Sequence, residues 1–539
     1  MPRLVLGPLL RFVEGTRATV WVEADRACTV EVLGCRVSTF PVAGHHYAIV
    51  VVDGLPADDV TPYEVSLDGE RVWPFEGWPA SVIRTRASAV PLRVAFGSCR
   101  AAAPLDDSSH GADALHSLAE RMRRQPVDEW PDLLMLLGDQ VYADDNISPL
   151  TLARIRYRRS QSTGAGWEVA NFGEYTELYE ESWSIPAIRW LLSTLPTAMI
   201  FDDHDVRDDW NTSDAWLREI RSTSWWQDRI EAALMSYWIY QHLGNLPPAE
   251  IESSPLLARL RDAADGEPVL REFARHADRN IEGAAPVRWS YHRDFGAVRL
   301  LVVDSRCGRV VDAARRAMVG PEEWAWVEQH ATGAFDHLLI ATSLPFLLPE
   351  GIHHLEAWNE ATCDRRWGAR FARTAEWLRQ RADLEHWAAF GRSFDQMTRL
   401  VGEVAGGKGR HGGPGGTPAT ITFLSGDVHF SYLAEARFPQ RDVTSRIYQA
   451  VCSPLRNPLA MGMRSGQRFG ATRTATRIGR ALGRSARIPP PELQWELVAG
   501  PAFGNQLGEL ELDGRAGLMR LSGALPEGCF QESFSARLS

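Results

Sequence analysis

The sequence predicts an α/β fold with a smaller all-β domain in front of it. Three observations support this prediction: short strands with turn signals fill residues 1–88, strands and helices alternate from residue 92 onward, and several later strands end in residues that bind metals. At 539 residues the chain exceeds the ~250–300 residues that one hydrophobic core usually reaches. We therefore expect two domains, residues 1–88 and residues 89–539.

The composition is that of a globular protein, with 45% apolar and 24% charged residues. The net charge of −11 argues against a scaffold for nucleic acid. The seven cysteines are scattered and odd in number, which is typical of a reduced cytoplasmic protein. Residues 1–15 are too interrupted for a secretion signal, and no stretch reaches the ~20 apolar residues of a membrane span. We therefore expect a cytoplasmic protein without a transmembrane segment, and the oligomeric state is left open.

Residues 1–88 contain short segments rich in β-branched and aromatic residues. Asp53-Gly54 and Asp68-Gly69 supply turns between them. This spacing predicts a small β-sandwich of the immunoglobulin or fibronectin type, followed by a linker at residues 79–91. Strands are expected at residues 18–23, 28–33, 47–52 and 62–67.

A strand, a helix and a second strand then follow in order and predict a βαβ unit with two parallel strands. Residues 92–97 have the pattern of a strand, and Leu115, Leu118 and Met122 lie on one face of a helix expected at residues 112–124. The unbroken apolar run at residues 133–137 is typical of a strand buried on both faces. Further strands are expected at residues 197–201, 287–293, 298–303, 337–342, 419–425 and 448–452, and further helices over residues 149–192, 214–244, 249–280, 321–330 and 354–400.

Four of the expected strands end in side chains that bind metal ions. The carboxyl ends of neighbouring parallel strands meet at one edge of a sheet, so ligands far apart in the sequence can converge there. Two metal ions about 3.5–4 Å apart need a bridging carboxylate and flanking donors of this kind. The four motifs are GSCR at residues 97–100, GDQVYADD at residues 138–145, DDHD at residues 202–205 and SGDVH at residues 425–429.

This series of motifs, together with VVDSR at residues 302–306, resembles the PhoD-like alkaline phosphatase family of the binuclear metallophosphoesterase superfamily. The TPYEVSLDG segment in the β domain ahead of the motifs also fits that family. The resemblance implies sheet layers covered by helices. It also implies a metal-dependent phosphoric ester hydrolase, a phosphomonoesterase or phosphodiesterase, that uses a metal-bound hydroxide at a binuclear site. The expected partner is a phosphate-ester substrate.

The resemblance implies a role for each motif residue. A Cys99 thiolate and a Tyr142 phenolate suit Fe³⁺, and Asp139 matches the bridging carboxylate. The second metal, held by oxygen ligands, would be Ca²⁺ or another divalent cation. His204 would face the substrate phosphate as general acid or hydrogen-bond donor, so His204 and Asp139 are the expected catalytic residues. The implied metal ligands are Cys99, Asp139, Tyr142, Asp203, Asp427 and His429.

Arg306 and Arg100 are the candidate substrate-binding residues. Arg306 belongs to the D-x-R motif, for which a buried ion pair and a phosphate contact both stay open. Thr342-Ser343 follow a strand at which other superfamily members often supply a histidine, so the second metal lacks a ligand. Family members are often exported by a twin-arginine signal, which is not visible in this sequence.

Residues 456–491 contain eight arginines and no acidic residue in a chain that is acidic overall. The segment is either a solvated arm or helix face packed on the acidic body, or a clamp for phosphate-bearing substrates or an anionic surface.

Two alternatives to the phosphatase hypothesis stay open. One is a phospholipase or phosphodiesterase acting on lipid or nucleotide diesters, and the other is a non-catalytic binding protein with a decayed site.

Overall fold

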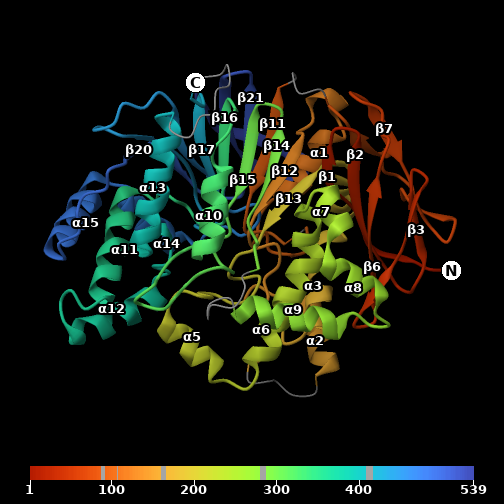
Figure 1. Ribbon diagram of the computed structural model, residues 1–539, viewed down its shortest axis with the longest axis horizontal. Helices are drawn as coiled ribbons and strands as arrows, with labels where there is room; N and C mark the ends of the chain where they lie inside the picture. Colours follow the sequence, from red (N-terminus) through yellow and green to blue (C-terminus); the bar gives the residue numbers. More distant parts are fainter. Residues whose placement is uncertain (87–90, 106, 160–164, 280–286, 408–416) are drawn as a thin grey trace.

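The computed structural model describes residues 1–86, 91–105, 107–159, 165–279, 287–407 and 417–539. An N-terminal β domain lies at one end of the molecule, and two larger sheets with helices around them form the rest (Figure 1). The α/β fold with an N-terminal all-β part, predicted from the sequence, is confirmed. None of the described helices is long and apolar enough to cross a membrane.

Two four-stranded antiparallel sheets form the N-terminal sandwich. Val20 and Val50 from one sheet pack with Val30 and Leu67 from the other in a common apolar core. The first sheet contains β1 (Leu4–Glu14), β2 (Arg17–Ala24), β6 (His45–Val52) and β5 (Phe40–Val42), and the second contains β4 (Cys35–Ser38), β3 (Thr29–Val32), β8 (Val65–Leu67) and β9 (Glu70–Trp73). A separate pair consists of β10 (Ser81–Arg84) and β7 (Val60–Tyr63).

The sequence analysis did not predict strand β1, and it predicted one strand where the structure has two. Pro8 lies in the middle of β1, where a proline normally argues against a strand, but register shifts on either side of it let the strand continue. The single strand expected at residues 62–67 is in fact two strands, β7 and β8, which lie in different sheets. The predicted boundary at residue 88 falls on residues 87–90, outside the described residues.

Two mixed sheets stack in the centre of the molecule. Phe96 and Met135 from one sheet meet Leu300 and Leu339 from the other in the core between them. The six-stranded sheet has the order β13 (Thr197–Ile200), β12 (Leu133–Leu137), β11 (Leu92–Gly97), β21 (Gln506–Asp513), β22 (Ala516–Leu525) and β23 (Cys529–Arg537). The seven-stranded sheet has the order β14 (Tyr291–Phe295), β15 (Val298–Val302), β16 (His337–Ala341), β17 (Thr420–Ser425), β19 (Arg446–Val451), β18 (Ser431–Arg437) and β20 (Gln494–Ala502).

The parallel strands have the arrangement that the βαβ pattern predicts. Strand β11 pairs parallel with β12, and β12 pairs parallel with β13. In the other sheet, β15, β16, β17 and β19 are parallel neighbours. The C-terminal strands β21, β22 and β23 were not predicted, and β21 pairs antiparallel with β11, with Leu510 opposite Val94.

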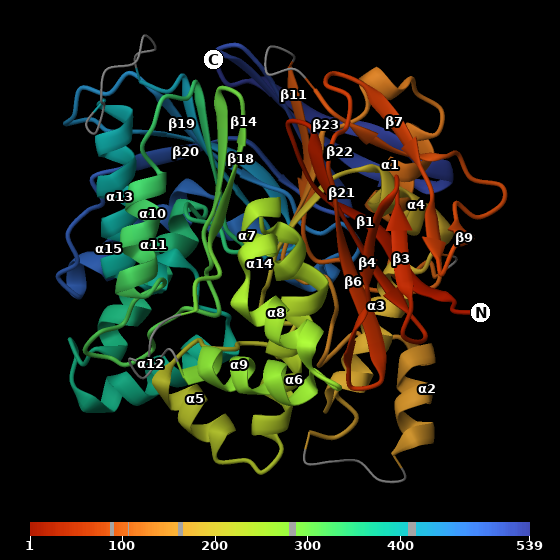
Figure 2. The same cartoon turned by 45° about the vertical axis from the view of Figure 1, so that its right-hand side comes forward.

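Helices cover the outer faces of the two sheets, and others lie below the sheets near the ends of β12 and β13 (Figures 1 and 2). The helices are α1 (Ala114–Met122), α2 (Pro149–Arg158), α3 (Phe172–Trp183), α4 (Pro186–Thr194), α5 (Asp214–Arg221), α6 (Trp226–Ser236), α7 (Pro248–Ser253), α8 (Pro255–Asp262), α9 (Glu267–Arg279), α10 (Pro321–His330), α11 (Glu350–Cys363), α12 (Ala369–Arg381), α13 (Gly391–Ala405), α14 (Met461–Gly470) and α15 (Arg473–Ser485). Short 3₁₀ turns lie at Val127–Glu129, Leu243–Asn245, Trp387–Ala389 and Pro526–Gly528, and a π-helical turn lies at Tyr237–His242.

The long helices expected from the sequence are divided into shorter ones. The stretch at residues 214–244 forms α5 and α6, and the stretch at residues 354–400 forms parts of α11, α12 and α13. A local signal explains one break, because Pro186 begins α4 within the stretch at residues 149–192. The Ser213 side chain caps the start of α5 by accepting a hydrogen bond from the Trp216 amide at 3.2 Å. Apolar periodicity alone had not shown these breaks.

Buried contacts hold the N-terminal sandwich against the rest of the chain. The Arg11 guanidinium donates to the carbonyl oxygens of Tyr240 and Gln241, each at 2.7 Å. The hydroxyl groups of Tyr47 and Tyr240 lie 3.0 Å apart, and Arg293 donates to the Arg11 carbonyl at 2.9 Å. The sandwich therefore packs against the π-helical turn at Tyr237–His242 and against β14 of the seven-stranded sheet.

Candidate metal centre

The predicted metal ligands lie at the carboxyl ends of strands from both central sheets. Cys99 follows β11 and Asp139 follows β12, whereas Asp427 and His429 follow β17 in the other sheet. The Asp427 amide donates a hydrogen bond to the Ser98 hydroxyl at 3.0 Å, which ties the two sheets together at this end. The chain segments that carry the ligands therefore meet at one place.

Four of these ligands adopt a left-handed backbone conformation. The φ angle is +57° at Cys99, +50° at Asp139, +67° at Asp427 and +56° at His429. Such conformations cost about 1–3 kcal/mol each in residues other than glycine, and they collect at functional sites. Each one turns the chain sharply just after a strand. The packing of the surrounding sheets stabilises these strained conformations. The conformations direct the ligand side chains toward one another.

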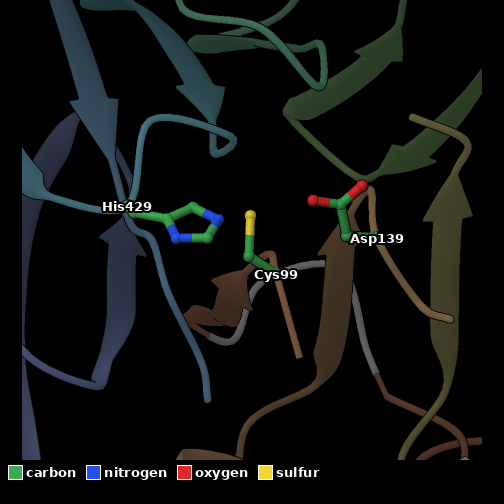
Figure 3. Close-up of side chains that lie close together, drawn as sticks. All are labelled: Cys99, Asp139 and His429. Atoms are coloured by element: carbon green, nitrogen blue, oxygen red, sulfur yellow. The ribbon is translucent and has the colours of Figure 1, made fainter. Parts of the chain in front are cut away.

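The first group of ligand atoms combines sulfur, oxygen and nitrogen. The Cys99 thiol, an Asp139 carboxylate oxygen and a His429 ring nitrogen all lie within 4.8 Å of one another (Figure 3). The Tyr142 hydroxyl lies 3.4 Å from Oδ2 of Asp139 and adds a fourth donor. Cys99, Asp139 and Tyr142 are buried. This mixture of donors is typical of a transition-metal site.

The protonation of these groups also fits a bound cation. Burial raises the pKa of the Cys99 thiol well above its usual value, and the carboxylates of Asp139 and Asp427 raise it further. Burial lowers the pKa of His429 to about 4, so its imidazole is neutral and can offer a lone pair. Burial likewise raises the pKa of Asp139, and its Oδ1 has no hydrogen-bond partner among the described residues. A cation would compensate for the burial of the thiolate and the carboxylate.

Asp139 also belongs to a second group of ligand atoms. Asp139, Asp203 and His204 have ligand atoms within 4.8 Å of one another, and so do Asp202, Asp203 and Asp427. Asp139 links the first group to the second, and Asp203 links the second to the third. A shared carboxylate between two sets of donors is the arrangement that two adjacent metals need.

The Arg306 guanidinium is fully buried among these carboxylates. It pairs with Asp202, lies 3.0 Å from Asp203 and 2.5 Å from Glu385, and comes within 3.7 Å of Asp427. Of the two alternatives left open by the sequence, these contacts are those of a buried ion-pair network. A role in binding substrate stays a prediction.

Arg100 is buried, and its guanidinium donates hydrogen bonds to other residues of the protein. Its Nε and Nη2 donate to Oδ2 of Asp113 at 3.0 and 2.7 Å. Its Nη1 donates to the carbonyl and hydroxyl oxygens of Ser182 at 2.8 and 3.1 Å. Only 2% of the residue is exposed, so these contacts favour a structural role. The predicted substrate contact of Arg100 finds no support in this arrangement.

His204 lies at the edge of the centre, against Tyr142 and Asp144. Its Nδ1 is 3.1 Å from both carboxylate oxygens of Asp144, and its ring centroid is 4.9 Å from that of Tyr142. Burial lowers the pKa of His204, but the carboxylates of Asp144 and Asp203 outweigh this effect, so the pKa lies well above its usual value. The two carboxylates therefore favour the protonated form of the imidazole.

An acidic cleft of about 440 Å³ lies beside His204. Asp144, Asp145, Asp208 and Asp209 line it together with Arg207. Burial and neighbouring carboxylates raise the pKa of Asp209 to about 10. The Asp208 side chain is 57% exposed, so water screens its charge.

The sequence analysis missed a histidine that the tertiary structure brings to the centre. Nε2 of His386 lies 2.9 Å from Oδ2 of Asp427, and Nδ1 lies 2.7 Å from Oε1 of Glu356. Glu385, the preceding residue, pairs with Arg306. The Glu385-His386 pair lies between α12 and α13, in a stretch expected to be helical, so no strand-end signal marked it.

Two further residues support the first group of ligands and were also missed. The Ser453 hydroxyl lies 3.2 Å from the Cys99 sulfur and accepts a hydrogen bond from the His429 amide at 3.1 Å. Asn457 forms hydrogen bonds that lower the pKa of Tyr142 and raise that of His429, although burial acts more strongly on both. Ser453 and Asn457 lie outside the four strand-end motifs, so no sequence pattern marked them as part of the site.

Comparison with known families supports a phosphoesterase. A domain of unknown function (DUF7800) matches residues 1–85, and the PhoD-like phosphatase model matches residues 109–374. Residues 109–374 therefore form a PhoD-like phosphatase domain. The matched stretch contains Asp139, Tyr142, Asp203 and His204 but ends before Asp427. No curated protein matches the chain.

A solved structure described as "Structure of PhoD" has the same fold. The similarity covers 99% of this chain and 90% of that chain, with a TM-score of 0.57 and 12% identity. At this identity the likeness shows the fold alone. The PhoD-like phosphatase domain indicates a phosphoric ester hydrolase, and the grouped thiol, carboxylates and imidazoles are its candidate metal-binding residues.

Proposed function

We propose that the protein is an alkaline phosphatase of the PhoD-like type, which hydrolyses phosphate monoesters or diesters at a binuclear metal site. One observation carries this proposal: Asp139 has a carboxylate oxygen close to the ligand atoms of Cys99 and His429 and also groups with Asp203, so it lies between two sets of donors. A carboxylate shared in this way brings two cations within reach of one phosphate. The proposed ligands are Cys99, Asp139, Tyr142, Asp203, Asp427 and His429.

The donors on the two sides of Asp139 favour different metals. Cys99 and Tyr142 can supply two anionic donors, a thiolate and a phenolate, which suit Fe³⁺. The carboxylates of Asp203 and Asp427 suit Ca²⁺ or another divalent cation. Arg306 lies 3.0 Å from Asp203 and reduces the negative charge there, which favours a divalent over a trivalent ion on that side.

His204 is the proposed general acid for the leaving oxygen. Asp144 holds its Nδ1 at 3.1 Å and stabilises the protonated imidazole, so the ring keeps one orientation and a proton to donate. When bound, the metals would neutralise charge on the phosphate and activate a water molecule. Tyr142 packs against the His204 ring and limits its movement.

Replacement of Asp139 by asparagine tests this proposal, with Asp312→Asn as the matched control at an exposed carboxylate. Purified proteins are supplied with iron and calcium and assayed on a phosphomonoester and on a phosphodiester, and their bound metals are counted. We expect D139N to lose roughly a hundredfold or more in activity and to retain less metal, because the shared ligand is lost. D312N should behave as the wild type, and the preferred ester identifies the substrate class.

Other results would change the conclusion. Wild-type activity in D139N would contradict the assigned site. Bound metals without turnover of either ester would indicate a narrow substrate choice. A wild-type protein without metal and without activity would support the alternative of a decayed site.

A further inference from the structure

The arginine-rich segment forms two helices, α14 and α15, on the outside of the molecule. Residues 456–491 carry eight positive charges and no negative one, so the chain's net charge of −11 leaves −19 on the remainder. Figure 1 places α15 at the outer edge of the molecule, beyond α11. The basic charge is thus concentrated at one end of an acidic protein.

A strip of small residues fixes which face of α15 points outward. Ala475, Gly479 and Gly483 are spaced four residues apart and are the buried residues of the helix. A Cβ atom at Gly479 would lie 2.7 Å from the Cβ of His354 in α11, so α15 packs closely through this strip. The opposite face, with its arginines, therefore cannot turn inward.

Most of these outward arginines have no acidic partner within the described parts of the chain. Arg480 forms an ion pair with Glu350 at 2.7 Å. Arg473, Arg477, Arg484 and Arg487 are exposed, and no ion pair is found for them among the described residues. These arginines are therefore exposed to solvent on a helix that packs on the body, and both interpretations of the segment, a solvated helix face and a clamp for an anionic surface, stay open.

Large apolar side chains are exposed on the same two helices. Met461 is 82% exposed, Met463 57%, Phe469 53% and Ile478 51%. Arginines together with exposed apolar side chains on short helices are typical of a surface that lies in the headgroup region of an anionic membrane. Contact with phosphates alone would not require the apolar side chains.

The helix pair begins next to the metal centre. Asn457, which interacts with Tyr142 and His429, is four residues before Met461, the first residue of α14. A surface held against α14 would therefore lie close to the proposed site.

We propose that α14 and α15 form a docking surface for an anionic phospholipid bilayer. The arginines supply attraction to the lipid headgroups, and the methionine, phenylalanine and isoleucine side chains enter the boundary with the acyl chains. Docking does not depend on the proposed phosphatase activity, although it would present lipid phosphates near the metal centre.

Vesicle flotation with the full-length protein tests docking directly. Vesicles of phosphatidylcholine alone are compared with vesicles in which phosphatidylglycerol replaces part of it. The test variant is R473Q/R477Q/R484Q, and the control is R36Q/R71Q/R537Q, which removes the same charge from exposed sheet positions. A second variant, M461S/M463S/I478S, removes apolar side chains without changing charge.

We expect the wild type and the control to float only with phosphatidylglycerol vesicles, and less so as salt rises. Each arginine near an anionic surface strengthens binding about fivefold, so the test variant should bind roughly a hundredfold more weakly. The serine variant should also bind more weakly. Activity on a soluble phosphate ester should stay unchanged in all variants, so loss of docking and failure of the phosphatase proposal are distinguishable.

Three outcomes would overturn the proposal. The wild type could bind both kinds of vesicle equally or neither, or R473Q/R477Q/R484Q could bind as the control does. Binding to a single-stranded oligonucleotide that is tighter than binding to the vesicles, and that the serine variant keeps, would assign the surface to nucleic acid instead.

Discussion

Nε2 of His386 lies 2.9 Å from Oδ2 of Asp427. Burial alone would raise the pKa of Asp427, but His386 and Arg306 hold it at about 2, so the carboxylate is ionised and ready to bind a cation. On its other side His386 contacts Glu356 at 2.7 Å. His386 therefore orients a proposed metal ligand from a loop between two helices.

Replacement of His386 by alanine should weaken metal binding. Loss of a residue that orients a metal ligand typically lowers affinity or activity roughly 10- to 100-fold. Titration of the apoprotein with the second metal, followed by an activity assay, measures this effect. His110→Ala, at a surface histidine paired with Asp107, is the control and should bind metal as the wild type does. Unchanged affinity in H386A would show that Asp427 needs no such support.

Replacement of Arg306 by methionine should destabilise the fold. The change removes a guanidinium that contacts Asp202, Asp203 and Glu385, and breaking a buried pair from one side costs about 3–5 kcal/mol. Urea unfolding of the metal-free protein measures the loss. If Arg306 acted only as a substrate ligand, unfolding would be unchanged and KM alone would rise.

Gly138 and Gly166 provide a matched pair for backbone strain. Both have positive φ, +105° and +67°, but a Cβ at Gly138 would lie 2.6 Å from the Cβ of Asp202, whereas nothing lies within 4 Å at Gly166. Gly166→Ala should cost about 1 kcal/mol, because only the left-handed conformation is disfavoured. Gly138→Ala should cost at least about 3 kcal/mol and reduce activity, because Asp202 must also move. Thermal unfolding compares them, and equal losses would contradict the close approach.

The pair of His204 and Asp144 predicts a pH dependence. The pKa of His204 is raised, so the pair's contribution to stability is complete below about pH 6.5 and is lost as the pH rises through the raised pKa. A general acid must be protonated, so activity should fall on the alkaline side of the profile. Asp144→Asn should move that fall to lower pH by about one unit or more.

The control for this prediction is Asp145→Asn. Asp145 lies 3.4 Å from the same Nδ1 atom but is mostly exposed, with 61% of its side chain open to solvent. Water screens its charge, so the alkaline limb should move much less. Equal shifts in the two variants would show that His204 responds to the charge of the cleft as a whole rather than to Asp144.

The sequence by itself determined the strands that carry the motifs, the motifs at their ends and hence the candidate ligands. The run at residues 133–137 and the residues Asp139 and Tyr142 behind it are local patterns, and local patterns are set by backbone and burial rules that act over a few residues. The same holds for Cys99 and His429. What these residues share, the end of an apolar strand, can be recognised without knowledge of the partner strand.

Only the tertiary structure decided which distant groups join them. His386 lies between helices and reaches Asp427 through packing, and Arg100 turns toward Asp113 rather than into the centre. Strand β21 pairs with β11 across more than four hundred positions of sequence, and no local period encodes such a pairing. Long-range contacts depend on the shape of the whole core, because burial and hydrogen bonding are satisfied collectively rather than residue by residue.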